Sequence, residues 1–422
     1  MRKLLNRFES VFVIIILSVY FGIHFPGMDP HKLGMQESDP YAFAINILLV
    51  GFLVIVAVSN RRGLLAAQRE VLLLWVLVAL TFISALWADT PAVVLRRSGN
   101  IFLTTAFSVY LYHRYGLQFL VGIFTRVHAL IILASFGILL ATPNLGLSAW
   151  GETGSWQGAF VGKNALGEVA ALGILTASYS FAIRANSRIV ATTVVVCNFI
   201  LLRMSHSITG MVALGLGLGV GIVGSLMQSR NSVWNIIAGI VVLVGMLIAV
   251  TVYLSPNDVF AVVGRSSDLS GRTEIWRAVM VAIQQRPLLG YGFGGFWLPG
   301  NVAANHVWAV IQWGPPNAHN GWLDLVLQLG IVGVSVALVL WLISVWRCLR
   351  LIITRQGNGV LYCAALLACL LLISLTESVI LRQAHFTWML FVVVYLHLAY
   401  SAKYQPVPSE VTVREQIGLM AE

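Results

Sequence analysis

Long apolar runs separated by short polar segments dominate the chain. A helix that crosses the hydrocarbon core of a bilayer needs about 20 mainly apolar residues. Twelve runs approach this length: 8–23, 41–58, 71–87, 98–112, 121–142, 165–183, 189–203, 209–227, 233–254, 320–346, 359–377 and 383–400. The pattern therefore predicts an all-α polytopic membrane protein with about 12 transmembrane helices, in which residues 1–422 form a single integral membrane domain.

The composition agrees with this pattern, because 59% of the 422 residues are hydrophobic and only 10% are charged. A soluble domain carries about 25% charged residues. The shortage of charge excludes a soluble globular enzyme, a disordered chain and a nucleic-acid-binding domain, although the net charge is +10. All four cysteines lie in or beside apolar runs, so we expect neither a disulfide framework nor a CxxC metal site.

Lysine and arginine gather on one side of the predicted membrane, and this bias sets the orientation of the chain. With the N-terminus in the cytoplasm, most of these residues fall in inner segments, including Arg184 and Arg188, with Arg126 near the inner end of its span. Both termini are then cytoplasmic, and residues 401–422 form a cytoplasmic tail. Residues 255–316 form the only long loop, and this loop lies on the outer side.

The long outer loop is predicted to contain an amphipathic helix between Arg272 and Arg286. Its apolar side chains share one helical face: Ile275, Trp276, Val279, Met280 and Ile283. Such a helix is typical of a membrane surface, where Arg272 would sit at headgroup depth and at a helix N-terminus that favours anions. The alternative is that the arginines of this loop, Arg265 among them, only reach lipid phosphates.

Two further segments follow this helix. Residues 287–297 alternate glycines with aromatic residues and predict a tight loop, which is not a nucleotide loop because the Lys-Ser/Thr of a P-loop is missing. His319 stands at the outer mouth of the next predicted span. An imidazole titrates near neutral pH and can take a proton from an alcohol, so His319 is a candidate general base. The alternative is a structural role, which is the more common one for a lone histidine at a membrane interface.

Other outer corners of the predicted bundle add polar residues: Arg96, Arg97, Lys163, Asn164, Arg203 and His206. A charge at bilayer depth is costly and usually faces a cavity or a partner, and Glu168 and Asp324 are the candidate counter-ions. Cations on the outer face predict a large anionic lipid headgroup as ligand. The chain has no DxD pair and no HExxH, GxSxG or CxxC motif, so we expect no metal and no cofactor.

Four segments, in this order along the chain, resemble motifs of the O-antigen ligase and Wzy-type O-antigen polymerase superfamily: 162–167 (GKNALG), 264–276, 287–292 (PLLGYG) and 318–323 (AHNGWL). The resemblance implies a GT-C-like glycosyltransferase of the bacterial inner membrane whose active site faces the periplasm. It also implies an undecaprenyl-diphosphate-linked oligosaccharide as donor, with His319 as the base and Arg272 holding the diphosphate. The sequence departs from the family at Ile208, where a basic residue is usual.

We therefore expect His319 to deprotonate an acceptor sugar whose hydroxyl then displaces undecaprenyl diphosphate, which inverts the anomeric centre. The residues expected to act with His319 are Arg272, in catalysis, and, in substrate binding, Arg265, Arg203, Lys163, Asn164, Arg96, Arg97, Asn320 and His206. The expected partners are the donor, the glycan acceptor, the lipid bilayer, and a flippase and chain-length regulator of the same pathway.

Three functions remain open at this point. The GKN motif and the Ser-Ile-Thr run at 207–209 favour a polymerase of surface or exopolysaccharide repeat units. A ligase that joins the glycan to lipid A core or another acceptor is the alternative. A transporter of an anionic substrate is the third reading, although transporters usually place polar sites near the bilayer midplane.

Overall fold

The computed structural model describes residues 12–20, 47–53, 68–148, 154–229, 231, 233–241 and 271–403. The named elements are α5 (Gln68–Ile83), the 3-10 helix η1 (Ser84–Leu86), α6 (Pro91–Ala141), α7 (Pro143–Gly146), α8 (Lys163–Ile183), α9 (Arg188–Met204), α10 (Ile208–Met227), α13 (Arg272–Gln285), α14 (Val302–Ile311), α15 (Gly321–Ile353), α16 (Val360–Thr376) and α17 (Phe386–Lys403). Residues 12–20, 47–53 and 233–241 are also helical. In the described ranges the β-structure is limited to one isolated bridge between Leu147 and Trp156.

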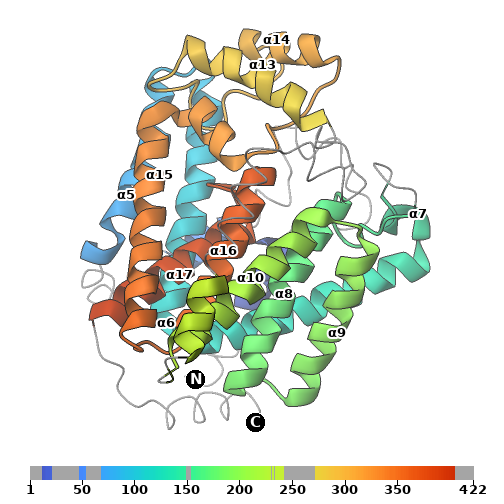
Figure 1. Cartoon of the computed structure of the whole chain (residues 1–422). Helices are drawn as coiled ribbons and strands as arrows, with labels where there is room; N and C mark the ends of the chain where they lie inside the picture. Colours follow the sequence, from blue (N-terminus) through green and yellow to red (C-terminus); the bar gives the residue numbers. More distant parts are fainter. Residues whose placement is uncertain are drawn as a thin grey trace.

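Apolar helices of membrane-spanning length confirm the predicted class of fold. Within the described residues, four helices are long and apolar enough to cross a bilayer, namely α6, α8, α10 and α15. Shorter apolar helices accompany them at Val71–Leu86, Val360–Thr376 and Phe386–Ala402. An all-helical, apolar bundle of this kind fits a polytopic membrane protein (Figure 1). The number of spans, expected to be twelve, stays a prediction.

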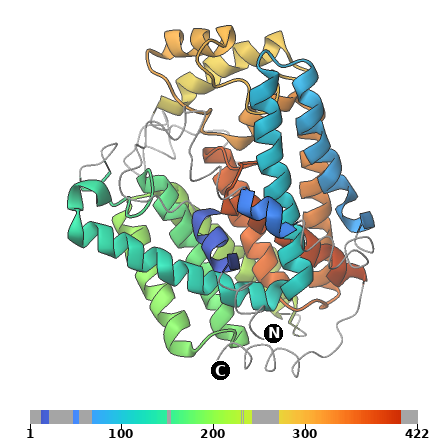
Figure 2. The same cartoon turned by 180° about the vertical axis from the view of Figure 1, so that it is seen from behind.

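Helix α6 contains two of the predicted spans, 98–112 and 121–142, in one run of 51 residues. Gly116 interrupts it with φ 68° and ψ 170°. A positive φ of this kind is open to glycine and strained for other residues, so the chain bends there. Figure 2 shows the two arms of α6 running in different directions from this bend.

Helix α15 differs from the single span predicted at 320–346, because Gly330 breaks it with φ 61° and ψ −164°. The backbone N–H groups of Tyr291 and Gly292 donate to the carbonyls of Leu327 and Gln328, at 2.8 and 3.0 Å. These carbonyls would otherwise serve the helix itself. The first arm therefore ends near residue 329, and the second arm runs from residue 331 to Ile353.

The glycine–aromatic loop predicted at 287–297 is the element that fixes this break. Beyond the break, the N–H of Ile331 donates to the carbonyl of Pro287 at 2.9 Å. A Cβ on Gly330 would lie 2.1 Å from the carbonyl oxygen of Leu288, and one on Gly290 would lie 2.5 Å from that of Leu327. The two backbones thus approach closely enough to exclude any side chain at either glycine.

The amphipathic helix predicted from Arg272 onward is present as α13, but its apolar face does not lie on the membrane surface as expected. Ile275 and Val279 are fully buried in a cluster with α14 and the glycine–aromatic loop. Only Met280 of the predicted face is strongly exposed, at 45%. Helices α13 and α14 together form a cap over one end of the bundle (Figure 1).

Candidate functional site

The carboxylate of Glu377 joins three side chains from separate parts of the chain. Its Oε1 accepts hydrogen bonds from Nη2 of Arg272 at 2.6 Å and from Nδ2 of Asn164 at 2.9 Å. Its Oε2 lies 3.0 Å from Nδ1 of His319. The sequence predicts all three partners as site residues, and the structure brings them together around one carboxylate.

Each member of this cluster stands at the end of a helix, where an apolar run meets a polar segment. Arg272 is the first residue of α13, and Asn164 is the second residue of α8. His319 directly precedes Asn320, the N-cap of α15, and Glu377 is the C-cap of α16. The site is therefore a meeting point of four helix ends beneath the α13–α14 cap (Figure 1).

A tight turn presents His319. Its backbone has φ 48°, and its N–H donates to Oδ1 of Asn317 at 2.9 Å. Oδ1 of Asn320 accepts hydrogen bonds from the backbone N–H groups of Trp322 and Leu323, at 3.0 and 3.1 Å, and so caps α15. The indole of Trp276 donates to the carbonyl of Ala318 at 2.9 Å. This last bond ties the turn to α13, the helix that begins with Arg272.

Asp324 fixes the spacing between the two loops that carry His319 and Glu377. Its buried carboxylate accepts hydrogen bonds from the indole of Trp297 at 2.7 Å, from the N–H of Ala318 at 3.1 Å, and from the hydroxyl of Ser378. Ala318 precedes His319, and Ser378 follows Glu377. Its oxygens are engaged by these neutral donors, and Asp324 makes no ion pair with a lysine or arginine among the described residues, so its expected role as a counter-ion stays a prediction.

The imidazole of His319 is held on one side and open on the other. Its side chain is 27% exposed, against 14% for Arg272 and 12% for Glu377. Nδ1 faces the carboxylate, whereas Nε2 makes no hydrogen bond with a described residue. When the ring is neutral, a proton on Nδ1 donates to Glu377 and leaves the lone pair on Nε2. That lone pair can accept a proton from a substrate.

The electrostatics keep Glu377 ionised. Burial would raise the pKa of Glu377, but the hydrogen bond and charge of His319, the charge of Arg272 and the amide of Asn164 outweigh it. The pKa of Glu377 therefore lies below its ordinary value of 4.5. A buried carboxylate with these partners is a fixed negative charge at neutral pH.

Glu168 forms a second carboxylate behind this cluster. It lies four residues after Asn164 in α8, hence on the same helix face, and is only 4% exposed. The sequence suggests Glu168 as a counter-ion, but the ion pair of Arg272 is made with Glu377.

Two cations border the cluster. Lys163 begins α8 next to Asn164 and is half-buried, and Arg382 is exposed on the loop that carries Glu377. Neither side chain makes a hydrogen bond or ion pair with a described residue. Their ammonium and guanidinium groups are available to an anionic ligand. Arg382 was not among the site residues expected from the sequence.

Arg97 lies at the glycine–aromatic loop. Nη1 of Arg97 donates to the carbonyl of Gly294, and the N–H of Gly294 donates to Oε1 of Gln328 at 2.8 Å. Arg96, one residue earlier in α6, is exposed. In this structure Arg97 helps to hold the loop that breaks α15.

Arg203 and His206 lie at the α9–α10 corner. Arg203 is exposed in the last turn of α9. His206 follows with φ 50°, and its Nδ1 lies 3.4 Å from Oγ of Ser155. Ile208, where the resemblance leads us to expect a basic residue, begins α10 and is 38% exposed. Arg265, also expected at the site, is outside the described residues.

Glu377 is the member of this cluster that the sequence analysis did not single out. It stands at the end of the apolar run predicted at 359–377, in the polar break before the next span. This break falls on the same predicted side as His319. An acidic residue at that position was the available signal, but nothing in the residue spacing tied it to Arg272 or His319.

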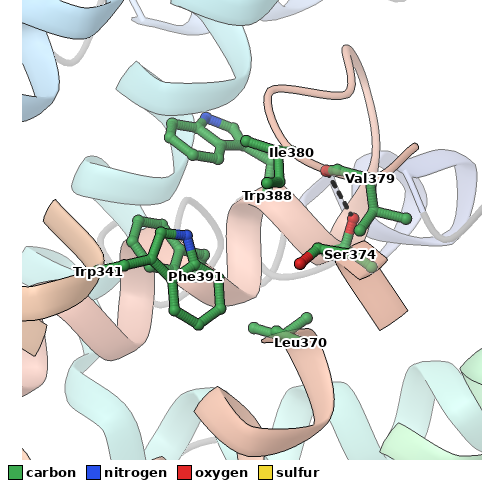
Figure 3. A pocket seen from close by; sticks show the side chains of 8 residues that line it. Trp341, Leu370, Ser374, Val379, Ile380, Trp388 and Phe391 are labelled. Carbon is green, nitrogen blue, oxygen red and sulfur yellow. Dashed lines mark hydrogen bonds between the residues drawn. The ribbon is translucent and has the colours of Figure 1, made fainter. Parts of the chain in front are cut away.

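A small apolar cavity of about 20 Å³ backs the loop that follows Glu377. Figure 3 shows the residues that surround it, including Trp341, Leu370, Ser374, Val379, Ile380, Trp388 and Phe391. Its volume is about that of one enclosed water molecule. Across its edge the hydroxyl of Thr387 donates to the carbonyl of Val379 at 3.4 Å, which anchors the loop to α17.

No metal-ligand cluster accompanies the site in the part of the chain that the structure describes. A group of three or more His, Cys, Asp or Glu side chains placed to hold an ion is absent there.

Comparison with known proteins agrees with the motif resemblance. Residues 193–342 match the sequence model of a family described as O-Antigen ligase. The matched segment runs from α9 into α15, so it includes Arg272 and His319 and ends before Glu377.

The chain is also similar to the exopolysaccharide production protein ExoQ of Rhizobium meliloti (strain 1021). The two are 26% identical over 192 residues, which cover 43% of this chain and 44% of that relative. The match thus spans less than half of either protein. Both findings support an O-antigen ligase/polymerase-like superfamily for this chain and, with the apolar helices, indicate a bacterial membrane protein.

Proposed function

We propose that this chain is a glycosyltransferase of polysaccharide assembly that moves a glycan from undecaprenyl diphosphate to an acceptor sugar. The observation that carries the proposal is the cluster of His319, Glu377 and Arg272, in which one carboxylate aligns a base and an arginine. The similarity to the O-antigen ligase family and to an exopolysaccharide production protein supports the same class of reaction.

His319 is the proposed general base. Its Nε2 takes the proton of an acceptor hydroxyl, and the oxygen attacks the anomeric carbon of the donor sugar. The bond from that carbon to the diphosphate oxygen breaks, and undecaprenyl diphosphate leaves with the electron pair. Glu377 holds the Nδ1–H and stabilises the imidazolium that forms, as a carboxylate does behind other catalytic histidines. Attack from the face opposite the leaving group inverts the anomeric centre.

Arg272 is the proposed ligand of the diphosphate. Only Nη2 of its guanidinium is engaged by Glu377, and the other N–H donors are free of described partners. Arginine binds phosphate oxygens through two parallel hydrogen bonds and stays charged throughout the reaction. Lys163 and Arg382 border the same space. Their positive charge would stabilise the negative charge that develops on the leaving diphosphate. Arg265, Arg203, Arg96, Arg97, His206 and Asn320 remain proposed glycan or diphosphate contacts.

The proposed product is a lengthened carrier-linked glycan, which makes the chain a polymerase of repeat units. The similarity to an exopolysaccharide production protein favours this outcome. The second candidate is a ligase that delivers the glycan to lipid A core, and the description of the matched family favours it. Both reactions use the same donor and the same step at His319, and they differ in the acceptor.

The proposed location is the bacterial inner membrane, with both termini in the cytoplasm and the His319 cluster on the periplasmic side. The lysine and arginine bias of the sequence supports this orientation. Residues 255–316 then form a large periplasmic loop, and residues 401–422 form a cytoplasmic tail. A flippase that supplies the donor and a chain-length regulator are the proposed partners.

Purified protein in detergent, given an undecaprenyl-diphosphate-linked repeat unit, tests this function. We expect release of undecaprenyl diphosphate together with a carrier-linked dimer or longer glycan, and equal rates with and without EDTA. Extension only when lipid A core is added would favour the ligase. Passage of the intact donor across proteoliposomes, with no new glycosidic bond, would contradict both and favour a transporter.

A further inference from the structure

The end of the bundle opposite the His319 cluster carries a second cationic feature. Helix α8 has 21 residues, and so spans about 31 Å at 1.5 Å per residue, which is about the thickness of a bilayer core. Asn164 at its start contacts Glu377, and Arg184 directly follows its end. Figure 1 shows the α8–α9 turn at the far end from the α13–α14 cap. Arg184 therefore lies at the other membrane surface.

An open cavity of about 480 Å³ is present at this turn. Its lining residues are Arg126, Arg184, Ala185, Asn186, Ser187 and Val190. Two of the six are arginines and none is acidic. A volume of this size falls in the range of small-molecule sites. The cavity is therefore large enough for a polar headgroup, and both charged side chains among its lining residues are cationic.

Hydrogen bonds preset the position of the Arg126 guanidinium in this cavity. Its Nε donates to Oδ1 of Asn186 at 3.0 Å. Asn186 in turn donates through Nδ2 to the carbonyl of Gly122 at 3.0 Å and to Oγ of Ser180 at 3.1 Å. These three bonds connect the two sides of the cavity, which are the second arm of α6 and the α8–α9 turn. A surface arginine that only reaches for lipid needs no such bracing.

Arg184 completes the pair. It caps α8 in the left-handed region, with φ 56° and ψ 35°, where glycine is the usual residue. Its side chain is exposed and makes no hydrogen bond or ion pair with a described residue. The two guanidinium groups thus come from separate helices and line one open cavity.

We propose that this cavity binds the phosphate of an anionic phospholipid headgroup, in the leaflet opposite the His319 cluster. Two guanidinium groups match the oxygens of a phosphodiester. Basic pockets between transmembrane helices recognise anionic headgroups in this way. The cytoplasmic assignment of that leaflet rests on the orientation proposed above; the binding itself does not.

Thermal unfolding of the purified full-length protein in a neutral detergent tests the site. Added phosphatidylglycerol should raise the Tm of the wild type by about 2 °C or more, because a ligand that binds the folded state stabilises it. Phosphatidylcholine and inorganic phosphate at equal concentration should not. The double variant Arg126→Gln/Arg184→Gln should weaken phosphatidylglycerol binding about tenfold or more.

Arg188→Gln is the matched control. Arg188 is on the same turn and carries the same charge, but it lies over the ring of Phe181 and does not line the cavity. It should keep the phosphatidylglycerol response. If the double variant unfolds, Arg184→Gln alone serves, because its side chain makes no described internal bond.

Three outcomes would overturn the proposal: an equal loss of the response in Arg188→Gln, an equal Tm shift with phosphatidylcholine, or a full shift with inorganic phosphate alone. The last would assign the cavity to a free anion. Because the measurement needs no transferase activity, its failure is distinct from failure of the proposed function.

Discussion

Oε2 of Glu377 lies 3.0 Å from Nδ1 of His319, although 58 residues separate the two in the sequence. The same carboxylate accepts a hydrogen bond from Arg272 through its other oxygen. One acidic residue therefore orients the proposed base, His319, and holds Arg272 beside it. This arrangement makes Glu377 a positioning residue. Its loss should affect both the orientation of His319 and the placement of Arg272.

Replacement of Glu377 by Gln should lower the rate of glycan transfer about 10²-fold or more, because an amide cannot stabilise the imidazolium that a general base forms. The rate of undecaprenyl diphosphate release by purified protein measures the effect. Glu274→Gln, which changes an exposed acid in the first turn of α13, is the control and should keep the wild-type rate. Equal rates in the two variants would show that Glu377 has no role in glycan transfer.

The lowered pKa of Glu377 predicts how stability depends on pH. A carboxylate whose pKa is lower in the folded than in the unfolded state stabilises the fold at pH values above the unfolded pKa. The contribution is lost as the pH falls from the ordinary value of 4.5 through the lower folded value. The Tm difference between wild type and Glu377→Gln should therefore be largest near neutral pH and shrink below about pH 4. A difference that grows on acidification would contradict this sign.

Arg272→Lys should lose activity although the positive charge is kept. An ammonium group cannot form two parallel hydrogen bonds to a phosphate while it also bonds Glu377. We expect a loss in kcat/KM of about tenfold or more, in line with the loss of one charge-assisted hydrogen bond. Arg188→Lys, at the opposite end of the bundle, should be neutral. Matching kcat/KM values for both variants would reduce Arg272 to a lipid anchor.

Gly330→Ala tests the break in α15, the helix that follows His319. The backbone angles at Gly330 are open essentially to glycine alone, and a Cβ there would lie 2.1 Å from the carbonyl oxygen of Leu288. We expect a destabilisation of about 1–3 kcal/mol. Gly219→Ala, within α10 with nothing inside 4 Å of its Cβ, should be neutral or stabilise by about 0.5–1 kcal/mol. The Tm of both variants measures the effect. An unchanged Tm for Gly330→Ala would contradict the claim that the glycine–aromatic loop leaves no room for a side chain at this position.

The sequence was sufficient for the features that depend on local pattern. Apolar runs predicted the helical membrane class, and the i, i+3, i+4 spacing predicted α13 to within a residue at each end. Helix-end residues such as Asn164, Arg272 and His319 stood out because polar groups at the ends of apolar runs are few.

What the sequence lacked was long-range pairing. The break at Gly330 depends on hydrogen bonds from Tyr291 and Gly292, which are some 40 residues away. The apolar face of α13 indicates burial, but it cannot tell a lipid surface from α14. Glu377 and Asp324 are ordinary acids in the sequence. Their partners, and so their different roles, appear only when the loops before α15 and after α16 are brought together.

Nε2 of His319 is the proposed base, and the variant His319→Gln tests this role most directly. Turnover of purified protein with an undecaprenyl-diphosphate-linked repeat unit should fall about 10²-fold or more, whereas donor binding should persist because arginines hold the diphosphate. His306→Ala, an exposed histidine of α14, should keep the wild-type rate. Wild-type turnover in His319→Gln would contradict the account.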